Sequence, residues 1–404
     1  MRLFLLLPVL ALMIFINSAC TSAAEIAVAD KWQRFDSEIS PRLAYFKTPG
    51  AAVAVVDNGK LVLCKGYGLR NINKKLPVDE RTCFQLASIS KFILALTAGT
   101  LVDSGALDWN IPAKRYYPQL DLSDAKVENQ ATLADLLSHQ SGLKSFDGDD
   151  WSAAGYNKTE ILARTKYLQL ANFRTRAQYS NVGFLLAGEA VGGAYSSTWE
   201  QAVTDKLFKP LKMSDSATHS TNPAYLSTHS NFAKHYTFDF CKKVNTPEPM
   251  TNFDPLGPAG TMASTASDMS KLLLMLTNGG YYDNQQILRS STITDIYTPQ
   301  IINTYGGPEG FSNGNNGLGC NSYLFNNQTV VEKDGVLNGT CSVISLIPAT
   351  NSGIVVLCNT DMIDFRGAVR ELFLEYVLGS TGRNLQEINY FTPWRIESGS
   401  SVSY

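Results

Sequence analysis

The sequence predicts an α+β protein in which both ends of the chain contribute strands to one antiparallel β-sheet. Two observations support this fold class. Short apolar segments with β-branched residues and Gly, Asn or Pro turns occur over 51–66 and again over 318–357. Between them, apolar residues recur mostly at helical spacing. The simplest closure places all the strands in one sheet flanked by helices, with a mostly helical subdomain, about 107–300, inserted between them.

Each element is predicted from its own pattern of apolar residues and turn signals. Strands 51–56 and 61–66 flank Asp57 to Lys60, a strong hairpin signal. A helix that is apolar on most sides begins near Ser88 and ends at Gly105, so we expect it to be buried. Other helices are expected over 31–46, 132–139, 159–170, 182–191, 199–208, 265–276 and 365–378. Other strands are expected over 318–325, 330–333, 341–347 and 353–357.

The N-terminus has the pattern of an export signal. Arg2 precedes an apolar run, 3–16, that is too short to span a membrane well, and small residues follow up to Ala24. Cleavage after Ala24 would give a periplasmic or secreted protein. Alternatively, Cys20 is lipidated and the protein is a membrane-tethered lipoprotein. In either case we expect residues 25–382 to form the folded domain, and 383–404 to be a polar tail.

The composition argues against several classes of function. The formal net charge is only -2, so nothing favours a nucleic-acid partner. The four histidines are widely spaced and no paired-cysteine or His-Glu-x-x-His motif occurs, so we expect no metal and no cofactor. Among the six cysteines that follow the leader, Cys341 and Cys358 are the best candidates for a disulfide, and buried free thiols are the alternative.

A candidate nucleophile stands at the start of the buried helix. Ser88 is expected where backbone N–H groups are unpaired, and Lys91, one turn later, lies on the same face. A hydroxyl beside an amine and free N–H donors suits an activated nucleophile. The alternative is an N-cap serine followed by a solvated lysine. A second Ser-x-x-Lys, Ser141 to Lys144, is interrupted by a glycine and is expected in a loop.

Two more short motifs follow in order along the chain. Tyr179-Ser180-Asn181 precedes a predicted helix, so Asn181 could also be an N-cap. Lys333-Asp334-Gly335 lies at the end of a predicted strand. A second Tyr-x-Asn, Tyr282 to Asn284, has the composition of a turn.

Taken together, the three motifs resemble those of the serine β-lactamase and penicillin-binding protein superfamily, in particular its branch of class C β-lactamases, D-alanyl-D-alanine carboxypeptidases and esterases. The resemblance extends from about Pro49 to Leu378. Residues 136–143 are similar to the family's "LLTHTSGL" element, and residues 259–262 to its "AGGL" element. Residues 210–213 resemble "PLGM", with Lys212 in place of Gly.

The resemblance implies acyl transfer through a covalent serine ester. Ser88 would attack a carbonyl, and Lys91 and Tyr179 would take its proton and return it to the leaving group; which of them is the base is left open. The oxyanion would lie between the backbone N–H groups of Ser88 and Val336. Substrate binding would fall to Asn181, Lys333, Asp334 and Gly335.

Asp334 departs from the family pattern, which has Thr or Ser at this position. An ionised Asp would repel a substrate carboxylate, which puts efficient β-lactamase and ordinary carboxypeptidase activity in doubt. Alternatively, Asp334 faces away and pairs with Lys333, or it binds a substrate amine.

Three functions therefore compete. The first is an exported serine hydrolase acting on D-Ala-D-Ala-type cell-wall peptides. The second is an esterase or class C-like β-lactamase, and the third is a catalytically silent binding or assembly protein. The expected partners are a small peptide, ester or lactam, with a membrane contact only through a lipid on Cys20.

Overall fold

The computed structural model of the protein describes residues 23–303 and 312–380. Its strands are β1 Gly50–Asp57, β2 Lys60–Asn71, β3 Leu76–Pro77, β4 Cys83–Gln85, β5 His235–Asp239, β6 Val244–Glu248, β7 Ala263–Thr265, β8 Tyr281–Tyr282, β9 Gln285–Gln286, β10 Ile301–Ile302, β11 Ser312–Asn316, β12 Asn321–Phe325, β13 Gln328–Leu337, β14 Thr340–Ile347 and β15 Ser352–Cys358. Its α-helices are α1 Ala23–Tyr45, α2 Ile89–Asp103, α3 Ala125–Gln130, α4 Leu133–Leu137, α5 Asp149–Ala153, α6 Lys158–Leu162, α7 Asn181–Ala194, α8 Trp199–Val203, α9 Pro223–Thr228, α10 Ala266–Thr277, α11 Ser290–Tyr297 and α12 Asp364–Leu378.

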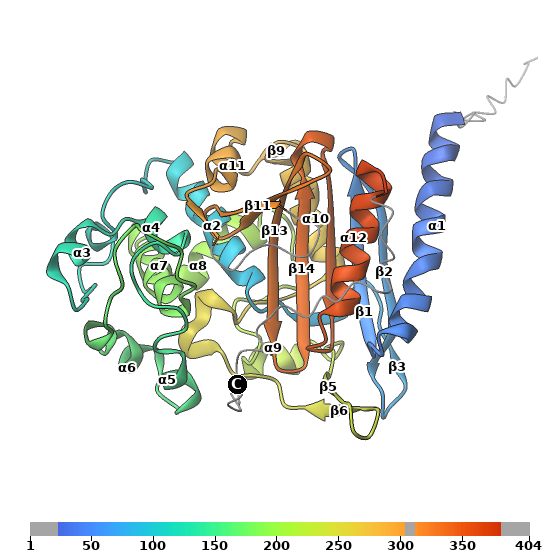
Figure 1. Ribbon diagram of the computed structural model, residues 1–404, viewed down its shortest axis with the longest axis horizontal. Coiled ribbons are helices and arrows are strands. Elements are labelled where there is room, and N and C mark those ends of the chain that lie inside the picture. The colour runs from blue at the N-terminus through green and yellow to red at the C-terminus, as the bar shows by residue number, and fades with distance from the viewer. Residues whose placement is uncertain (1–22, 304–311, 381–404) are drawn as a thin grey trace, which may run out of the picture.

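One large sheet joins the two ends of the chain. Its order is β10-β11-β12-β13-β14-β15-β1-β2-β3, and every pairing in it is antiparallel. The N-terminal strand β1 lies between β2 and the C-terminal strand β15, so strands far apart in the sequence are neighbours (Figure 1). The predicted fold class, including closure of the sheet from both ends, is confirmed.

Helices cover both faces of this sheet. Alternate side chains of a strand point to opposite faces. Val53 and Val55 of β1 therefore join a core with residues of α1 and α12, whereas Ala52 and Ala54 join a second core with residues of α2 and α10. Burial on both faces explains why the central strands have continuous apolar sequences rather than alternating ones.

The second core continues from the sheet into the inserted helices. It includes Leu94 of α2, Leu185 of α7 and Trp199 of α8, together with Leu273 of α10. Helix α10 packs directly on β1 and β15. The expected insertion, about 107–300, therefore contains one helix that belongs to the layer covering the sheet, and the helical part and the sheet share one hydrophobic core.

Two of the differences from the predicted elements have a clear local cause. The helix expected over 159–170 is divided into α6 and a 3₁₀ turn, Thr165–Tyr167, because the Thr165 hydroxyl donates to the carbonyls of Leu162 and Asp121. Helix α7 begins earlier than expected, and its N-cap is Ser180, which accepts a hydrogen bond from Gly183. The alternative role of Asn181 as an N-cap is therefore wrong.

The thiols of Cys341 and Cys358 face each other across β14 and β15. The two residues are paired in register and are almost completely buried, and both are free thiols in this structure. The expected leader with Cys20 and the expected tail, 383–404, lie outside the described residues. Within the described part of the chain, no helix has the length and apolar character needed to cross a bilayer.

Candidate active site

Ser88 stands on a tightly held turn between β4 and α2. The residue before it, Ala87, has φ +49°, a left-handed conformation that costs a non-glycine residue on the order of 1–3 kcal/mol. Two hydrogen bonds hold Leu86 at the start of the turn: the Leu86 N–H donates to the Met262 carbonyl at 2.8 Å, and the Ser342 hydroxyl donates to the Leu86 carbonyl at 2.7 Å. Ser88 itself occupies the N-cap position of α2, but its hydroxyl caps no backbone N–H.

The hydroxyl of Ser88 lies between an amine and a phenol. Lys91 Nζ donates to Ser88 Oγ at 3.1 Å, and the Tyr179 hydroxyl donates to it at 2.7 Å. These three groups come from positions up to 91 residues apart in the chain. Their contact places two proton-accepting groups within reach of one hydroxyl, which is the geometry needed to activate a serine nucleophile.

Lys91 is completely buried, so the alternative of a solvated first-turn lysine is wrong. Besides Ser88, its ammonium donates to Asn181 Oδ1 and to the Ala259 carbonyl, each at 2.7 Å. Burial lowers the pKa of the Lys91 amine; Tyr179 opposes this effect and Lys333 adds to it. A lysine with a lowered pKa can act as a base closer to neutral pH.

The Tyr179 ring is enclosed by two other rings and two ammonium groups. The ring of His139 lies 4.5 Å and that of Phe146 lies 5.3 Å from its centroid, while Lys91 Nζ and Lys333 Nζ lie 4.8 Å and 5.0 Å away. His139 Nδ1 accepts the Ser180 N–H. Burial and the charges of Lys333 and Lys91 lower the pKa of His139 well below its ordinary value, so the ring is neutral and carries its proton on Nε2. From the sequence, His139 was assigned no role beyond its place in the element similar to "LLTHTSGL".

The Asn181 amide is engaged with the protein at both ends. Its oxygen accepts from Lys91, and its nitrogen donates to Asp149 Oδ2 at 2.6 Å. Asn181 is expected to take part in substrate binding; in this structure its amide contacts Lys91 and Asp149. Sequence reasoning missed Asp149 and the Ala259 carbonyl, because neither a carboxylate in so short a helix nor a backbone oxygen belongs to a recognisable motif.

The free edge of β13 passes beside Ser88. Strand β12 pairs with β13 only as far as Glu332, and within the described ranges no strand pairs with the following residues on that side. Leu337 and Thr340 close the hairpin with β14, which makes Val336 and Cys341 a non-hydrogen-bonded pair and directs the Val336 N–H toward the free edge. A Cβ on Gly335 would lie 2.7 Å from the Ser88 nitrogen, so the two backbones approach too closely for any side chain.

Lys333 and Asp334 point to opposite faces of the sheet. Lys333 is buried on the Ser88 side, and its ammonium makes no hydrogen bond to the residues that the structure describes. Asp334 faces α12, where Arg366 donates to it at 3.2 Å. Although burial would raise the pKa of Asp334, the charges of Arg366 and Lys333 hold it below its ordinary value.

The assignment of Asp334 to substrate binding is therefore wrong, and so is its pairing with a substrate amine. The reason is the period of two along a strand: a neighbour of the inward-facing Lys333 must face outward. The same Arg366 also donates to the carbonyls of Gly335 and Ser342, at 3.0 and 2.9 Å, so it stabilises the end of β13 from the sheet face that α12 covers.

The duplicate motifs lie elsewhere. Lys144 donates to Gln169 at the surface and does not contact Ser141. Asp283 and Asn284 form the turn between β8 and β9, both with positive φ.

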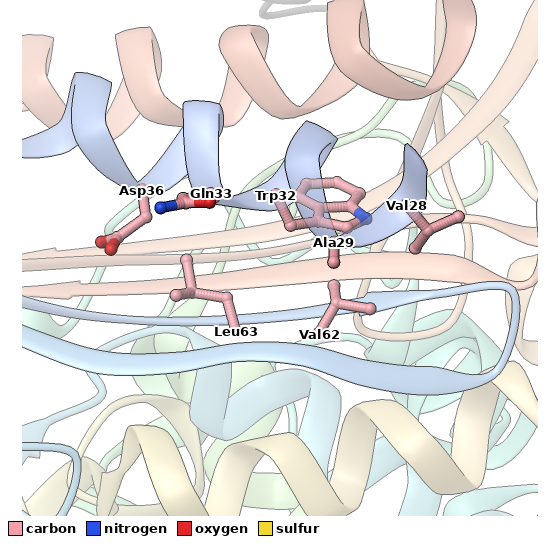
Figure 2. Close-up of a pocket in the computed structure, with 7 residues that line it drawn as sticks. All are labelled: Val28, Ala29, Trp32, Gln33, Asp36, Val62 and Leu63. Atoms are coloured by element: carbon pink, nitrogen blue, oxygen red, sulfur yellow. The ribbon is translucent and has the colours of Figure 1, made fainter. Parts of the chain in front are cut away.

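A separate groove lies on the other side of the sheet, between α1 and β2 (Figure 2). It has a volume of about 460 Å³ and contains no serine beside an amine. Its lining residues are Val28, Ala29, Trp32, Gln33, Asp36, Val62 and Leu63. The groove therefore lacks the chemistry found around Ser88.

Comparison with known proteins defines the class of this protein. Residues 35–375 match the family model described as Beta-lactamase, and the chain belongs to this family. Solved structures with the same fold include an octameric penicillin-binding protein homologue from Pyrococcus abyssi, with a TM-score of 0.74 and 23% identity, covering 90% of this chain and 79% of that one. A class C β-lactamase aligns with a TM-score of 0.68 and 23% identity, over 89% of this chain and 98% of that one. EstCE1, a hydrolase with promiscuous acyltransferase activity, has a TM-score of 0.71 and 17% identity, over 88% of this chain and all of that one.

Curated relatives are equally diverse. Protein flp of Staphylococcus aureus strain MW2 is 25% identical over 82% of this chain, and unguisins hydrolase ungD' of Aspergillus campestris is 28% identical over 81%. The chain spans 63% and 61% of the lengths of these two relatives.

Proposed function

We propose that this protein is an exported serine hydrolase that cleaves D-alanyl-D-alanine-type peptides of the cell wall through an acyl-serine intermediate. The observation that carries the hydrolase chemistry is the contact of Ser88 Oγ with both Lys91 and Tyr179. The preference for a peptide with a free carboxylate rests on Lys333, a buried ammonium beside Tyr179 that makes no hydrogen bond within the described ranges. A buried cation without a partner is costly unless a substrate anion compensates it.

The proposed reaction follows from these positions. Ser88 Oγ attacks the carbonyl carbon while its proton passes to the neutral amine of Lys91 or to an ionised Tyr179. The carbonyl oxygen becomes an oxyanion and accepts hydrogen bonds from the backbone N–H groups of Ser88 and Val336. When the bond to the leaving group breaks, the same proton returns to the departing amine and leaves a serine ester. Water then attacks the ester with the same base, which releases the acid and regenerates Ser88.

A second candidate is an esterase or a class C-like β-lactamase. It is favoured by Asp334, because the residue at this position supplies no hydroxyl to the Ser88 side and is instead bound to Arg366. An ester needs no donor for a substrate carboxylate. The third candidate, a catalytically silent binding protein, is disfavoured by the intact contacts among Ser88, Lys91 and Tyr179.

Labelling with a fluorescent penicillin separates these candidates. Stable labelling at Ser88 supports the peptidase, rapid loss of the label supports the β-lactamase, and labelling that persists in Ser88→Ala would remove the nucleophile assignment. A panel of D-amino-acid peptides and p-nitrophenyl esters then identifies the acyl group. Hydrolysis of esters without release of D-alanine would favour the esterase over the peptidase.

Export is a separate part of the proposal and rests on the sequence of residues 1–24. The mass and N-terminus of the protein recovered from a secreting host distinguish cleavage after Ala24 from lipidation at Cys20. Radiolabelled palmitate incorporated into the wild type but not into Cys20→Ala would support the lipoprotein form. A full-length, unprocessed protein in the cytoplasm would contradict both forms.

A further inference from the structure

A chain of hydrogen bonds leads from Ser88 to a carboxylate that no motif includes. Ser88 Oγ contacts Lys91 at 3.1 Å, Lys91 contacts the Asn181 oxygen at 2.7 Å, and the Asn181 nitrogen contacts Asp149 Oδ2 at 2.6 Å. Asp149 is the first residue of the short helix α5, which packs near the turn Asp254–Ala259. Asp149 therefore reaches Asn181 from the inserted helical part of the chain.

The chemistry of the amide makes this contact directional. An amide has one accepting oxygen and one donating NH₂ group, and a carboxylate can only accept. Asp149 therefore fixes the NH₂ group toward itself and the oxygen toward Lys91. The oxygen stabilises the charged ammonium, whereas a reversed amide would present a donor and favour the neutral amine. The orientation of Asn181 thus depends on the negative charge of Asp149.

The surroundings of Asp149 are unusual for a carboxylate. Its second oxygen, Oδ1, is buried and has no hydrogen-bond partner in the described parts of the chain. Burial raises the pKa of Asp149 to about 6, against the opposing effects of the Asn181 hydrogen bond and the Lys91 charge. Asp150 and Asp147, from its own segment, raise it further. The negative charge of Asp149 is therefore stabilised by Asn181 and Lys91 rather than by water.

We infer that Asp149 is a positioning residue that orients the Asn181 amide and thereby sets the protonation of Lys91. The inference rests on the proposed serine hydrolase function. The two charges are separated by one amide and two hydrogen bonds, roughly 7 Å, so loss of the carboxylate charge should move a neighbouring pKa by about one to two units. Because removing a negative charge favours proton loss from Lys91 and from Tyr179 alike, the direction is the same whichever of them is the base.

The pH dependence of kcat/KM for a neutral p-nitrophenyl ester tests this role. In Asp149→Asn, the acidic limb of the profile should move about one unit toward lower pH. The value of kcat at the optimum pH should change by a smaller factor than kcat/KM changes on the acidic limb. Asp150→Asn is the matched control: it removes a neighbouring charge that is exposed and does not bond to Asn181 in the structure, and its profile should follow the wild type. Profiles of Asp149→Asn and wild type that superimpose would overturn the inference.

Further measurements separate the possible failures. Labelling of Ser88 with a fluorophosphonate is measured on every variant. A wild type that is not labelled rejects the proposed function, whereas a labelled wild type with an unmoved limb in Asp149→Asn rejects only the role of Asp149. If Asp149→Asn does not fold, Asp149→Ser removes the same charge with a smaller side chain. Asp149→Glu keeps the charge and should keep the wild-type limb; a shift as large as that of the neutral variant would contradict the inference.

Discussion

The close approach of β13 to Ser88 makes Gly335→Ala a sharp test of the active-site geometry. The added Cβ would lie 2.7 Å from the Ser88 nitrogen, 2.5 Å from the Leu86 oxygen and 2.8 Å from Ser342 Oγ. Two of these atoms belong to the backbone, and a carbon needs roughly 3.5 Å from such neighbours. The strand or the Ser88 turn must therefore move by most of an ångström. This movement changes the distance between the Ser88 and Val336 N–H groups, the two proposed donors to the oxyanion.

The expected result is a loss of kcat of about 10²–10³, the usual cost of removing one oxyanion donor, with the chain still folded. Overpacking should also lower the free energy of unfolding by about 1–3 kcal/mol. The assay is the ester hydrolysis described above, together with thermal unfolding followed by circular dichroism. A folded Gly335→Ala protein whose kcat stays within about threefold of the wild type would refute the proposed oxyanion site.

Gly183→Ala is the matched control for this substitution. Its Cβ would meet only ordinary contacts, at 3.5–3.6 Å, although Gly183 lies two residues after Asn181 in α7. An added methyl group at that helical position should leave kcat unchanged and stabilise the protein by about 0.5–1 kcal/mol, because alanine has the higher helix propensity.

Three further outcomes follow from other parts of the structure. Asp334→Asn should change kcat/KM by less than about threefold because this side chain faces α12; a gain or loss above tenfold in ester hydrolysis would contradict that placement. His219 lies 3.2 Å from Glu200 and from Asp254, and although its burial lowers the pKa, the two carboxylates raise it to about 9. Because the folded-state pKa of His219 is raised, its ion pairs stabilise the folded protein fully below about pH 6.5, and this stabilisation, at most roughly 3 kcal/mol, is lost as the pH rises through 9. The fall in Tm from pH 7 to 10 should therefore be smaller in His219→Gln, and an equal fall would count against the ion pair. Among the six cysteines that the structure describes, native protein should show one fast thiol toward Ellman's reagent, that of the exposed Cys241, and Cys241→Ser should lose it. Two extra thiols on reducing the unfolded protein would instead reveal a disulfide such as Cys341–Cys358.

The sheet and the buried helix α2 were predicted well from the sequence because both depend on patterns of residues that are close together in the chain. The apolar runs of β1, β14 and β15 and the turn at Asp57 to Lys60 identify strands without reference to partners. Short elements such as α5 and the β5–β6 hairpin were missed, because they are too brief or too polar for periodicity to appear. Asp149 was missed with α5.

The sequence by itself determined the chemistry available to this protein: a hydroxyl and an amine one helical turn apart, a tyrosine before a helix and a lysine on a strand. Helical and strand periods are local, so they can be read from one stretch of chain. Only the tertiary structure decided which groups meet. Closing the sheet brought β13 to Ser88, turned Asp334 toward Arg366 and placed Asp149 against Asn181. Contacts of this kind depend on how distant segments pack, and packing is set by the whole core rather than by any single motif.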